Sequence, residues 1–451
     1  MWDLESGISI LVGMNRREFL KSSAAAGTIA HVSPSHARPV APSDRVTVGV
    51  LGSGARAQQI VDEIVTIPGV EVVAVCDAYT GRAQRARERT GGRAQIHHHY
   101  KDILGLQDVD TVLIGSPDHW HRDMAIDAVE AGKDVYIEKP LTYSIDEGLE
   151  IIDAVKRTKR MLMVGSQGIS SATQQKARRL IKEGRLGKIT MIRASYNRNT
   201  ASGAGLYPIP PDASPRTVNW EQFLGRAPQH PFSLPRFFRW RCYGDYSGGI
   251  ATDLFVHLVT TIHYVTGAKM PRSAIASGQL YRWKESRDVP DTINAIMVYP
   301  EGFTANLSST FNNQSSAESG FKILGTEGTL SFRGSGLVFT PESAHEDNRW
   351  VVRSWTRELE DAYYSDPEVQ KMESPSTWAS SMSEGSETWH GQGKSATYNH
   401  FVNFLESVKS RRQPVENALI GHRAASCAHL INTSAEKETM VSWDFEKERM
   451  A

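Results

Sequence analysis

A short apolar run that leads directly into a glycine turn constrains the fold of this chain more than any other feature. Residues 46–51 read Val-Thr-Val-Gly-Val-Leu, and residues 52–57 follow at once as Gly-Ser-Gly-Ala-Arg-Ala. The first run is typical of a buried strand, and the residues after the glycines have helical periodicity. Gly52 permits a tight turn, Gly54 leaves room for a pyrophosphate, and Ala57 lets the helix pack closely on the strand. The pattern therefore predicts a dinucleotide site.

An acidic residue further along the chain narrows the choice of dinucleotide. The first backbone N–H groups of the helix, at Ala55 and Arg56, are placed to hold the pyrophosphate. A second predicted strand, residues 70–76, ends at Asp77, 25 residues after the first glycine. A carboxylate at that position hydrogen-bonds ribose hydroxyls and repels a 2′-phosphate, so we expect NAD. NADP stays open as the alternative because of two nearby arginines, Arg82 and Arg85.

Strands and helices continue to alternate up to residue 165, which predicts a doubly wound parallel sheet over residues 44–165. The further expected elements are strands at 110–115, 134–137 and 161–165 and helices at 119–131 and 144–158. Ligands of open α/β sheets bind outside the carboxyl ends of the strands. The residues that follow two of these strands are therefore candidates for the cofactor site: Ser116, Pro117, Glu138 and Lys139.

Three motifs in this region resemble the Gfo/Idh/MocA oxidoreductase family. They are Gly52-x-Gly54, Ser116-Pro117-x-x-x-His121, and the run Ala-Gly-Lys-Asp-Val-Tyr-Ile-Glu-Lys-Pro at 131–140. The resemblance implies a Rossmann domain followed by a domain with a large open sheet, one face of which covers the nicotinamide. It also implies that Glu138 lies near the nicotinamide ribose and that Lys139 is catalytic. An ammonium removed from water can transfer a proton or stabilise an alkoxide, which supports Lys139 independently. For His121 and Trp120 we expect contacts on the cofactor side rather than catalysis.

Residues 166–440 are expected to form the substrate domain, an α+β unit on a large open mixed sheet. The expected elements are helices at 171–183, 395–410 and 418–433 and strands at 188–198, 273–279, 292–299, 303–311, 320–324 and 329–332. Residues 199–247 are rich in Pro, Arg and aromatic residues with little periodicity, which favours a binding loop. Residues 334–396 are interpreted as a loop-rich insertion. His400 and His422 are interpreted as packing residues.

A second motif carries the candidate catalytic residues of this domain. Gly248 and Gly249 can start a helix close to a ligand, and Asp253 and His257 follow at i, i+4 on one helix face. The resemblance places an Asp and a His on the substrate side of the nicotinamide. His257 has the pKa range of a general base, and Asp253 would orient it or bind the sugar. Upstream residues suited either to sugar contacts or to loop packing are Arg239, Trp240 and Tyr243.

Composition excludes several classes of function. The chain has 51 Lys and Arg against 51 Asp and Glu, so no nucleic-acid partner is expected. The three cysteines are scattered, and the histidine run 97–99 has no carboxylate or cysteine partner in register, so no metal site is expected. The sequence has no apolar run of about 18 residues, and stable membrane insertion is not expected.

Residues 1–43 resemble a twin-arginine export signal with its linker. Arg16 and Arg17 precede Phe-Leu-Lys, a weakly apolar stretch and the small-residue pattern Ser-His-Ala at 35–37. The export machinery would then be a partner, and the protein would work folded in the periplasm or outside the cell. Met14, directly before the motif, is an alternative start.

The leading interpretation is an NAD(P)-dependent oxidoreductase that acts on a sugar, a sugar derivative or a cyclic polyol. A hydride would pass to a tightly bound nicotinamide while His257 or Lys139 takes the hydroxyl proton. The alternative is an NAD-dependent glycoside hydrolase, as some members of the resembled family are, which oxidises a ring carbon transiently and eliminates the glycosidic substituent. We expect a homo-oligomer.

Overall fold

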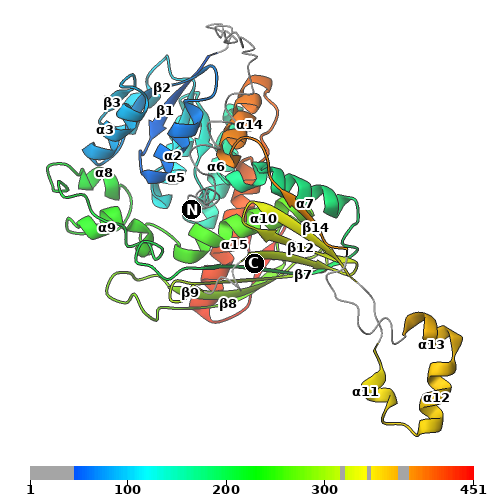
Figure 1. Cartoon of the computed structure of the whole chain (residues 1–451). Coiled ribbons are helices and arrows are strands. Elements are labelled where there is room, and N and C mark those ends of the chain that lie inside the picture. The colour runs from blue at the N-terminus through cyan, green and yellow to red at the C-terminus, as the bar shows by residue number, and fades with distance from the viewer. Residues whose placement is uncertain (1–44, 315–319, 343–346, 374–384) are drawn as a thin grey trace, which may run out of the picture. The chain divides into compact units, whose positions relative to one another are not determined.

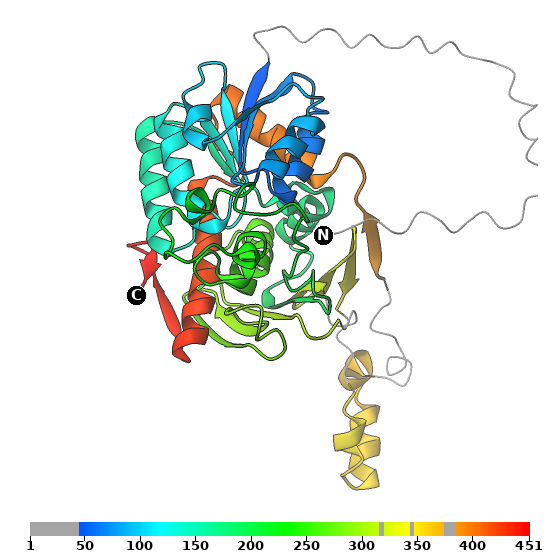
Figure 2. The same cartoon turned by 90° about the vertical axis from the view of Figure 1, so that its left-hand side faces the viewer.

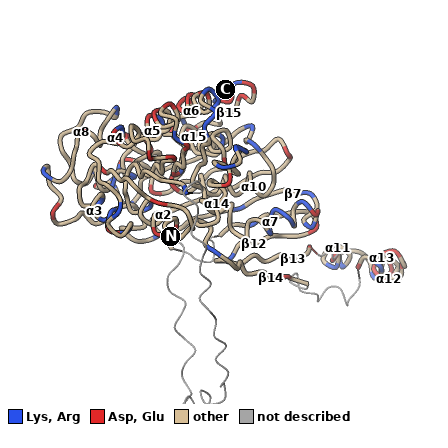
Figure 3. The backbone as a smooth tube through the Cα atoms, turned by 90° about the horizontal axis from the view of Figure 1, so that it is seen from above, with Lys and Arg blue, Asp and Glu red and all other residues tan. Residues whose placement is uncertain are grey.

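The computed structural model describes residues 45–314, 320–342, 347–373 and 385–451. Val46–Ala451 form one compact unit. The export signal predicted at 1–43 lies outside the described residues. Among the described residues, no helix combines the length and the apolar character needed to cross a bilayer. Basic and acidic residues are interspersed along the described backbone, in keeping with the balanced composition (Figure 3).

The first sheet is parallel and has six strands in the order β3-β2-β1-β4-β5-β6. Its strands are β1 (Val46–Leu51), β2 (Val70–Cys76), β3 (Gln95–His97), β4 (Thr111–Ile114), β5 (Asp134–Ile137) and β6 (Leu162–Val164). The strand order reverses between β1 and β4, and ligands of doubly wound sheets bind beside such a reversal. The predicted nucleotide-binding fold is thus confirmed.

Helices cover both faces of this sheet (Figure 1). The helices that follow its strands are α2 (Ala55–Ile64), α3 (Thr80–Arg89), α4 (Tyr100–Leu104), α5 (His121–Glu130) and α6 (Ile145–Thr158). One apolar layer joins α2 to α14 (Ala396–Ser410), whose Phe401 and Phe404 are fully buried against the sheet. A helix from the far end of the chain therefore completes the first domain.

The second sheet is mixed and has ten strands in the order β14-β13-β12-β11-β7-β10-β9-β8-β15-β16. Its strands are β7 (Ile189–Asn197), β8 (Ser273–Gln279), β9 (Thr292–Val298), β10 (Thr304–Thr310), β11 (Gly320–Gly325), β12 (Gly328–Arg333), β13 (Gly336–Pro341), β14 (Glu387–His390), β15 (Val441–Asp444) and β16 (Arg449–Met450). One face packs against three helices, α7 (Ala172–Lys182), α10 (Val256–Thr266) and α15 (Ala418–Lys437), in a continuous apolar core (Figures 1 and 2). The predicted large open sheet is confirmed.

Two regions without clear periodicity contain regular structure. Within 334–396, β13 pairs with β12 and β14, so both ends of this segment extend the sheet. Between them lie α11 (Arg349–Val352), α12 (Arg357–Ser365) and α13 (Pro367–Met372).

The segment 199–247 contains α8 (Trp220–Leu224) and α9 (Leu234–Phe238). Its aromatic residues form a buried cluster that includes Tyr79 from the first domain. Between and around its two short helices, this segment is held in place by packing among aromatic side chains.

Candidate active site

The glycine turn has the geometry that a dinucleotide requires. Gly52 has a φ of 82°, and a Cβ there would lie 2.7 Å from the backbone nitrogen of Ser116. Gly54 caps α2 without any side-chain hydrogen bond. The first-turn N–H groups of this ten-residue helix, which begins with Ala55 and Arg56, are therefore open to an anionic ligand. The turn fits a pyrophosphate.

Asp77 lies beside this turn. Its Oδ2 accepts a hydrogen bond of 2.7 Å from the backbone N–H of Ser53, and its Oδ1 accepts one of 2.9 Å from Tyr79. Burial raises the pKa of Asp77, against the effects of Arg82 and of these two bonds. The guanidinium of Arg82 itself lies 5.1 Å above the ring of Phe238.

A second polar group is placed for the cofactor in the loop after β4. Among the described residues, the buried hydroxyl of Ser116 has no hydrogen-bond partner. Such an orphaned buried group is uncommon in proteins unless a ligand or water completes it. Together with Asp77 and the glycine turn, it fits a bound dinucleotide.

The ammonium of Lys139 joins the two domains. Lys139 follows β5, and its Nζ donates hydrogen bonds to the backbone oxygen of Asp253 at 2.6 Å and to its Oδ1 at 2.9 Å. The two side chains are only 9% and 20% exposed. The Lys139–Pro140 peptide bond is cis. Two residues that the sequence singled out independently are thus in direct contact.

Asp253 has a second cationic partner, Arg241, whose Nε lies 3.2 Å from the same carboxylate oxygen. Burial alone would raise the pKa of Asp253, but Lys139 and Arg241 outweigh it and hold that pKa below the ordinary value. Asp253 therefore stays ionised and anchors two cations. It is not suited to exchange protons during a reaction at neutral pH.

The helix that carries Asp253 contains a π-helical turn over Ala251–Phe255, directly before α10. Among the described residues, no hydrogen bond joins the carboxylate of Asp253 to the ring of His257, because the carboxylate is engaged by Lys139 and Arg241. Burial and the nearby Lys139 ammonium lower the pKa of His257 well below its usual range. His257 is therefore neutral at pH 7, the form that can take up a proton, and the same shift makes it a weaker base than an ordinary histidine.

Asp118 is a buried carboxyl that was not among the site residues expected from the sequence. It lies in the 3₁₀ turn after β4 and is only 4% exposed. Burial raises its pKa to about 7, although Arg241 and Lys139 act in the opposite direction. Its position inside the Ser116-Pro117-x-x-x-His121 motif, at the carboxyl end of a strand, is the signal that could have found it.

His121 and Glu138 are held by the protein itself. The ring nitrogens of His121 contact the backbone oxygens of Pro140 at 2.6 Å and Ser116 at 3.1 Å, so this residue links the loops after β4 and β5. Glu138 Oε1 accepts from Arg56 at 3.2 Å and from Gln167 at 2.7 Å. Both residues position the walls of the site. Neighbouring Trp120 likewise donates to a backbone oxygen in α8.

The three candidate sugar-binding residues make packing contacts. Arg239 donates to the backbone oxygen of Tyr207 at 2.9 Å. The ring of Trp240 lies under the Arg241 guanidinium, 4.1 Å away. The ring of Tyr243 lies under the guanidinium of Arg236. Arg241, between them in the sequence, is the residue that reaches Asp253. His400 and His422 are fully buried with internal hydrogen bonds, as expected for packing residues.

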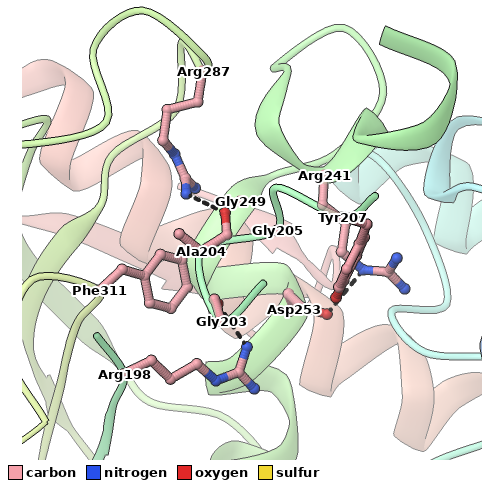
Figure 4. A pocket seen from close by; sticks show the side chains of 10 residues that line it. All are labelled: Arg198, Gly203, Ala204, Gly205, Tyr207, Arg241, Gly249, Asp253, Arg287 and Phe311. Carbon is pink, nitrogen blue, oxygen red and sulfur yellow. Dashed lines mark hydrogen bonds and ion pairs between the residues drawn. The ribbon is translucent and has the colours of Figure 1, made fainter. Parts of the chain in front are cut away.

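A small pocket opens beside Asp253 (Figure 4). Its walls are formed by Arg198, Gly203, Ala204, Gly205, Tyr207, Arg241, Gly249, Asp253, Arg287 and Phe311. Part of the irregular segment 199–247 therefore does line a cavity. Within the described residues, no group of three or more His, Cys, Asp or Glu side chains is arranged to hold a metal ion.

Comparison with known families agrees with this geometry. Residues 46–166 match the family described as "Oxidoreductase family, NAD-binding Rossmann fold", and residues 215–331 match the "GFO/IDH/MocA C-terminal domain". The chain belongs to the Gfo/Idh/MocA family. The two matches together cover more than half of its length.

Among curated proteins, the chain is 30% identical over 210 residues to a "Glycosyl hydrolase family 109 protein" of Shewanella sp. (strain W3-18-1). This match covers 41% of the chain and 46% of the relative. It is 29% identical over 163 residues to an "Alpha-N-acetylgalactosaminidase" of Shewanella oneidensis, covering 34% of the chain and 35% of the relative. The chain thus matches less than half the length of these curated relatives.

Solved structures share the fold over most of the chain. A levoglucosan dehydrogenase in complex with NADH and levoglucosan superimposes with a TM-score of 0.66 at 18% identity, covering 88% of this chain and 99% of that one. The WlbA dehydrogenase from Bordetella pertussis, in complex with NADH and UDP-GlcNAcA, superimposes with a TM-score of 0.62 at 18% identity. This match covers 89% of this chain and 98% of that one. At these identities the likeness shows the fold alone.

Proposed function

We propose that this protein is an NAD-dependent oxidoreductase that acts on a CH–OH group of a sugar, a sugar derivative or a cyclic polyol. The observation that carries the proposal is the buried contact of Lys139 with Asp253, beside a neutral His257. This contact lies at the carboxyl end of β5, where ligands of parallel sheets bind. Dehydrogenases of this fold that hold NADH and sugars support the assignment.

The chain's own residues suit nucleotide binding. The N–H groups of α2 would hold the pyrophosphate, Asp77 the adenosine ribose, and Ser116 would add a hydroxyl nearby. A carboxylate at position 77 favours NAD, with NADP as the less favoured cofactor. When bound, the nicotinamide supplies a hydride acceptor for the carbinol carbon.

Three side chains would handle the proton and the developing charge. His257, neutral because of its lowered pKa, takes the hydroxyl proton. Two donors of the Lys139 ammonium are held by Asp253, and the third is left for the substrate oxygen. Asp253 fixes the direction of that third donor and compensates the buried ammonium.

Net glycoside hydrolysis with a recycled cofactor is the second candidate. The matches to family 109 glycosyl hydrolases favour it, and so does Asp118. A carboxyl whose pKa is about 7 can carry a proton at neutral pH, as protonation of a glycosidic leaving group requires. Both candidates use Lys139 and His257.

One experiment separates the two candidates. The purified protein is denatured, and mass spectrometry identifies the released nucleotide, which we expect to be NAD(H). The folded protein is then tested in two assays. In the first, sugars and polyols are added and the absorbance of reduced nicotinamide is followed. In the second, p-nitrophenyl glycosides are added without cofactor and their cleavage is measured. Absorbance change with free sugars supports the oxidoreductase, and glycoside cleavage with bound nucleotide alone supports the hydrolase. Absence of nucleotide, together with no nucleotide binding on titration, contradicts both.

We further propose export through the twin-arginine pathway, on the sequence around Arg16 and Arg17. Changing both arginines to lysine should leave a folded protein in the cytoplasm. Unchanged export in a cell-fractionation assay would contradict this proposal.

A further inference from the structure

The pocket beside Asp253 has an unusual set of charges. Three of the residues that line it are arginines, Arg198, Arg241 and Arg287, and one is a carboxylate, Asp253 (Figure 4). Asp253 already accepts from the ammonium of Lys139. A cavity with several cations and one shared anion attracts a negatively charged ligand.

Arg287 forms a wall of the pocket, and backbone oxygens accept from three of its five N–H donors. It is 5% exposed, and its guanidinium donates to the backbone oxygens of Val289 at 2.9 Å, Ala204 at 2.8 Å and Pro290 at 3.2 Å. The neighbouring carboxylate of Asp291 accepts instead from backbone N–H groups of residues 281–283. Among the ion pairs of the described residues, Arg287 has no carboxylate partner.

Arg198 and Arg241 keep donors for a ligand. Arg198 follows β7 and donates through Nη1 to the backbone oxygen of Gly203 at 3.1 Å. Arg241 uses its Nε for Asp253 and lies on the ring of Trp240. A guanidinium has five N–H donors, and these hydrogen bonds between described residues use one of them in each arginine. Figure 4 shows the two guanidinium groups on either side of Asp253.

We propose that the substrate is an acidic sugar, whose ring carries a carboxylate that binds to Arg198 and Arg241 while its reacting hydroxyl faces Lys139. This inference rests on the proposed function and names its substrate class. Planar guanidinium groups match the two oxygens of a carboxylate, and the arrangement sets direction as well as affinity.

The test measures binding separately from turnover. The protein with its bound nucleotide is titrated calorimetrically with glucuronate and galacturonate, each against its parent hexose, and with glucose 6-phosphate. We expect a uronate to bind more tightly than its hexose. Arg198→Gln should weaken uronate binding about 10- to 100-fold and leave hexose binding unchanged, because a hydrogen bond to a charged group is lost. Arg198→Lys, which keeps the charge, should retain part of the affinity.

Arg193→Gln is the matched control, because Arg193 is an exposed residue of β7. It should bind uronates like the unchanged protein. Equal binding of uronates and hexoses, absence of uronate binding, tighter binding of the phosphate, or unchanged uronate affinity in Arg198→Gln would each overturn the proposal. If uronates bind through Arg198 but no sugar is oxidised or cleaved, the proposed function is wrong and the acidic subsite stands. If hexoses react as well as uronates, the function stands and the subsite is wrong.

Discussion

The ammonium of Lys139 and the carboxylate of Asp253 meet at 2.9 Å between the end of β5 in the parallel sheet and a π-helical turn in the second domain. Both side chains are largely buried. Removal of one partner from such a pair leaves an uncompensated buried charge. Under the proposed function, catalysis and the contact between the two domains depend on the same pair of residues.

Lys139→Ala should retain bound nucleotide and lose turnover by roughly 10²–10⁴-fold, because it removes the group that we propose to act on the substrate oxygen. The measurement is single-turnover hydride transfer, followed at the absorbance of the reduced nicotinamide. Lys156→Ala is the control, since Lys156 is an exposed residue of α6. A near-normal rate in Lys139→Ala would place the reaction elsewhere in the protein.

A double-mutant cycle should show that Asp253 acts through Lys139 more than through His257. Its carboxylate contacts the lysine, whereas no hydrogen bond to the His257 ring exists among the described residues. Asp253→Asn combined with Lys139→Ala should raise the activation free energy of hydride transfer by much less than the sum of the two single changes. For Asp253→Asn combined with His257→Ala, the increase in activation free energy should come closer to the sum. The same single-turnover assay gives both cycles, and the reverse ranking would contradict this geometry.

Gly52→Ala should abolish nucleotide retention, whereas Gly92→Ala should not. Both glycines have positive φ, 82° and 77°. A Cβ on Gly52 would lie 2.7 Å from the backbone nitrogen of Ser116, but a Cβ on Gly92 meets nothing within 4 Å. Gly92→Ala therefore costs only the backbone strain, about 1–2 kcal/mol of unfolding free energy. Two measurements on both variants check this prediction: the amount of nucleotide released on denaturation, and the thermal unfolding curve. Wild-type retention in Gly52→Ala would refute the assigned turn.

Local sequence patterns were sufficient for most elements of the fold. The strand before Gly52 and the helix after it are specified by residues close together in the chain, and β8 has the bounds that were expected. The strands β13 and β14 were missed because they lie at the two ends of a long segment without periodicity.

The site was only partly predictable because its contacts are made between distant residues. Lys139 and Asp253 were each found from a motif, but their contact joins residues 114 positions apart. Arg198 follows a strand without any motif. Asp118 lies inside a motif at a strand end, but only its burial in the folded protein distinguishes it from the other polar residues there. The i, i+4 spacing suggested a pair of Asp253 with His257, but Lys139 and Arg241 engage that carboxylate instead.

Asp118 should make the stability of the protein depend on pH between about pH 4 and pH 7. Burial raises its folded-state pKa to about 7, above roughly 3.9 in an unfolded chain. Between these values the folded protein binds the proton and the unfolded chain releases it. The contribution of Asp118 to stability is therefore full below about pH 4 and falls as pH rises toward 7, by at most about 1.4 kcal/mol per pH unit.

Asp118→Asn removes this titration while keeping the size of the side chain. Its unfolding free energy, measured by denaturant titration from pH 4 to 8, should decline less with rising pH than that of the unchanged protein. If Asp118 also donates a proton to a glycosidic leaving group, glycoside cleavage should fall above about pH 7 in the unchanged protein and be lost in Asp118→Asn. Asp123→Asn is the control, because Asp123 is a neighbouring carboxylate already paired with Arg122 and Arg226. Parallel stability curves for Asp118→Asn and the unchanged protein would show that Asp118 is ionised throughout, and would remove it as a proton donor.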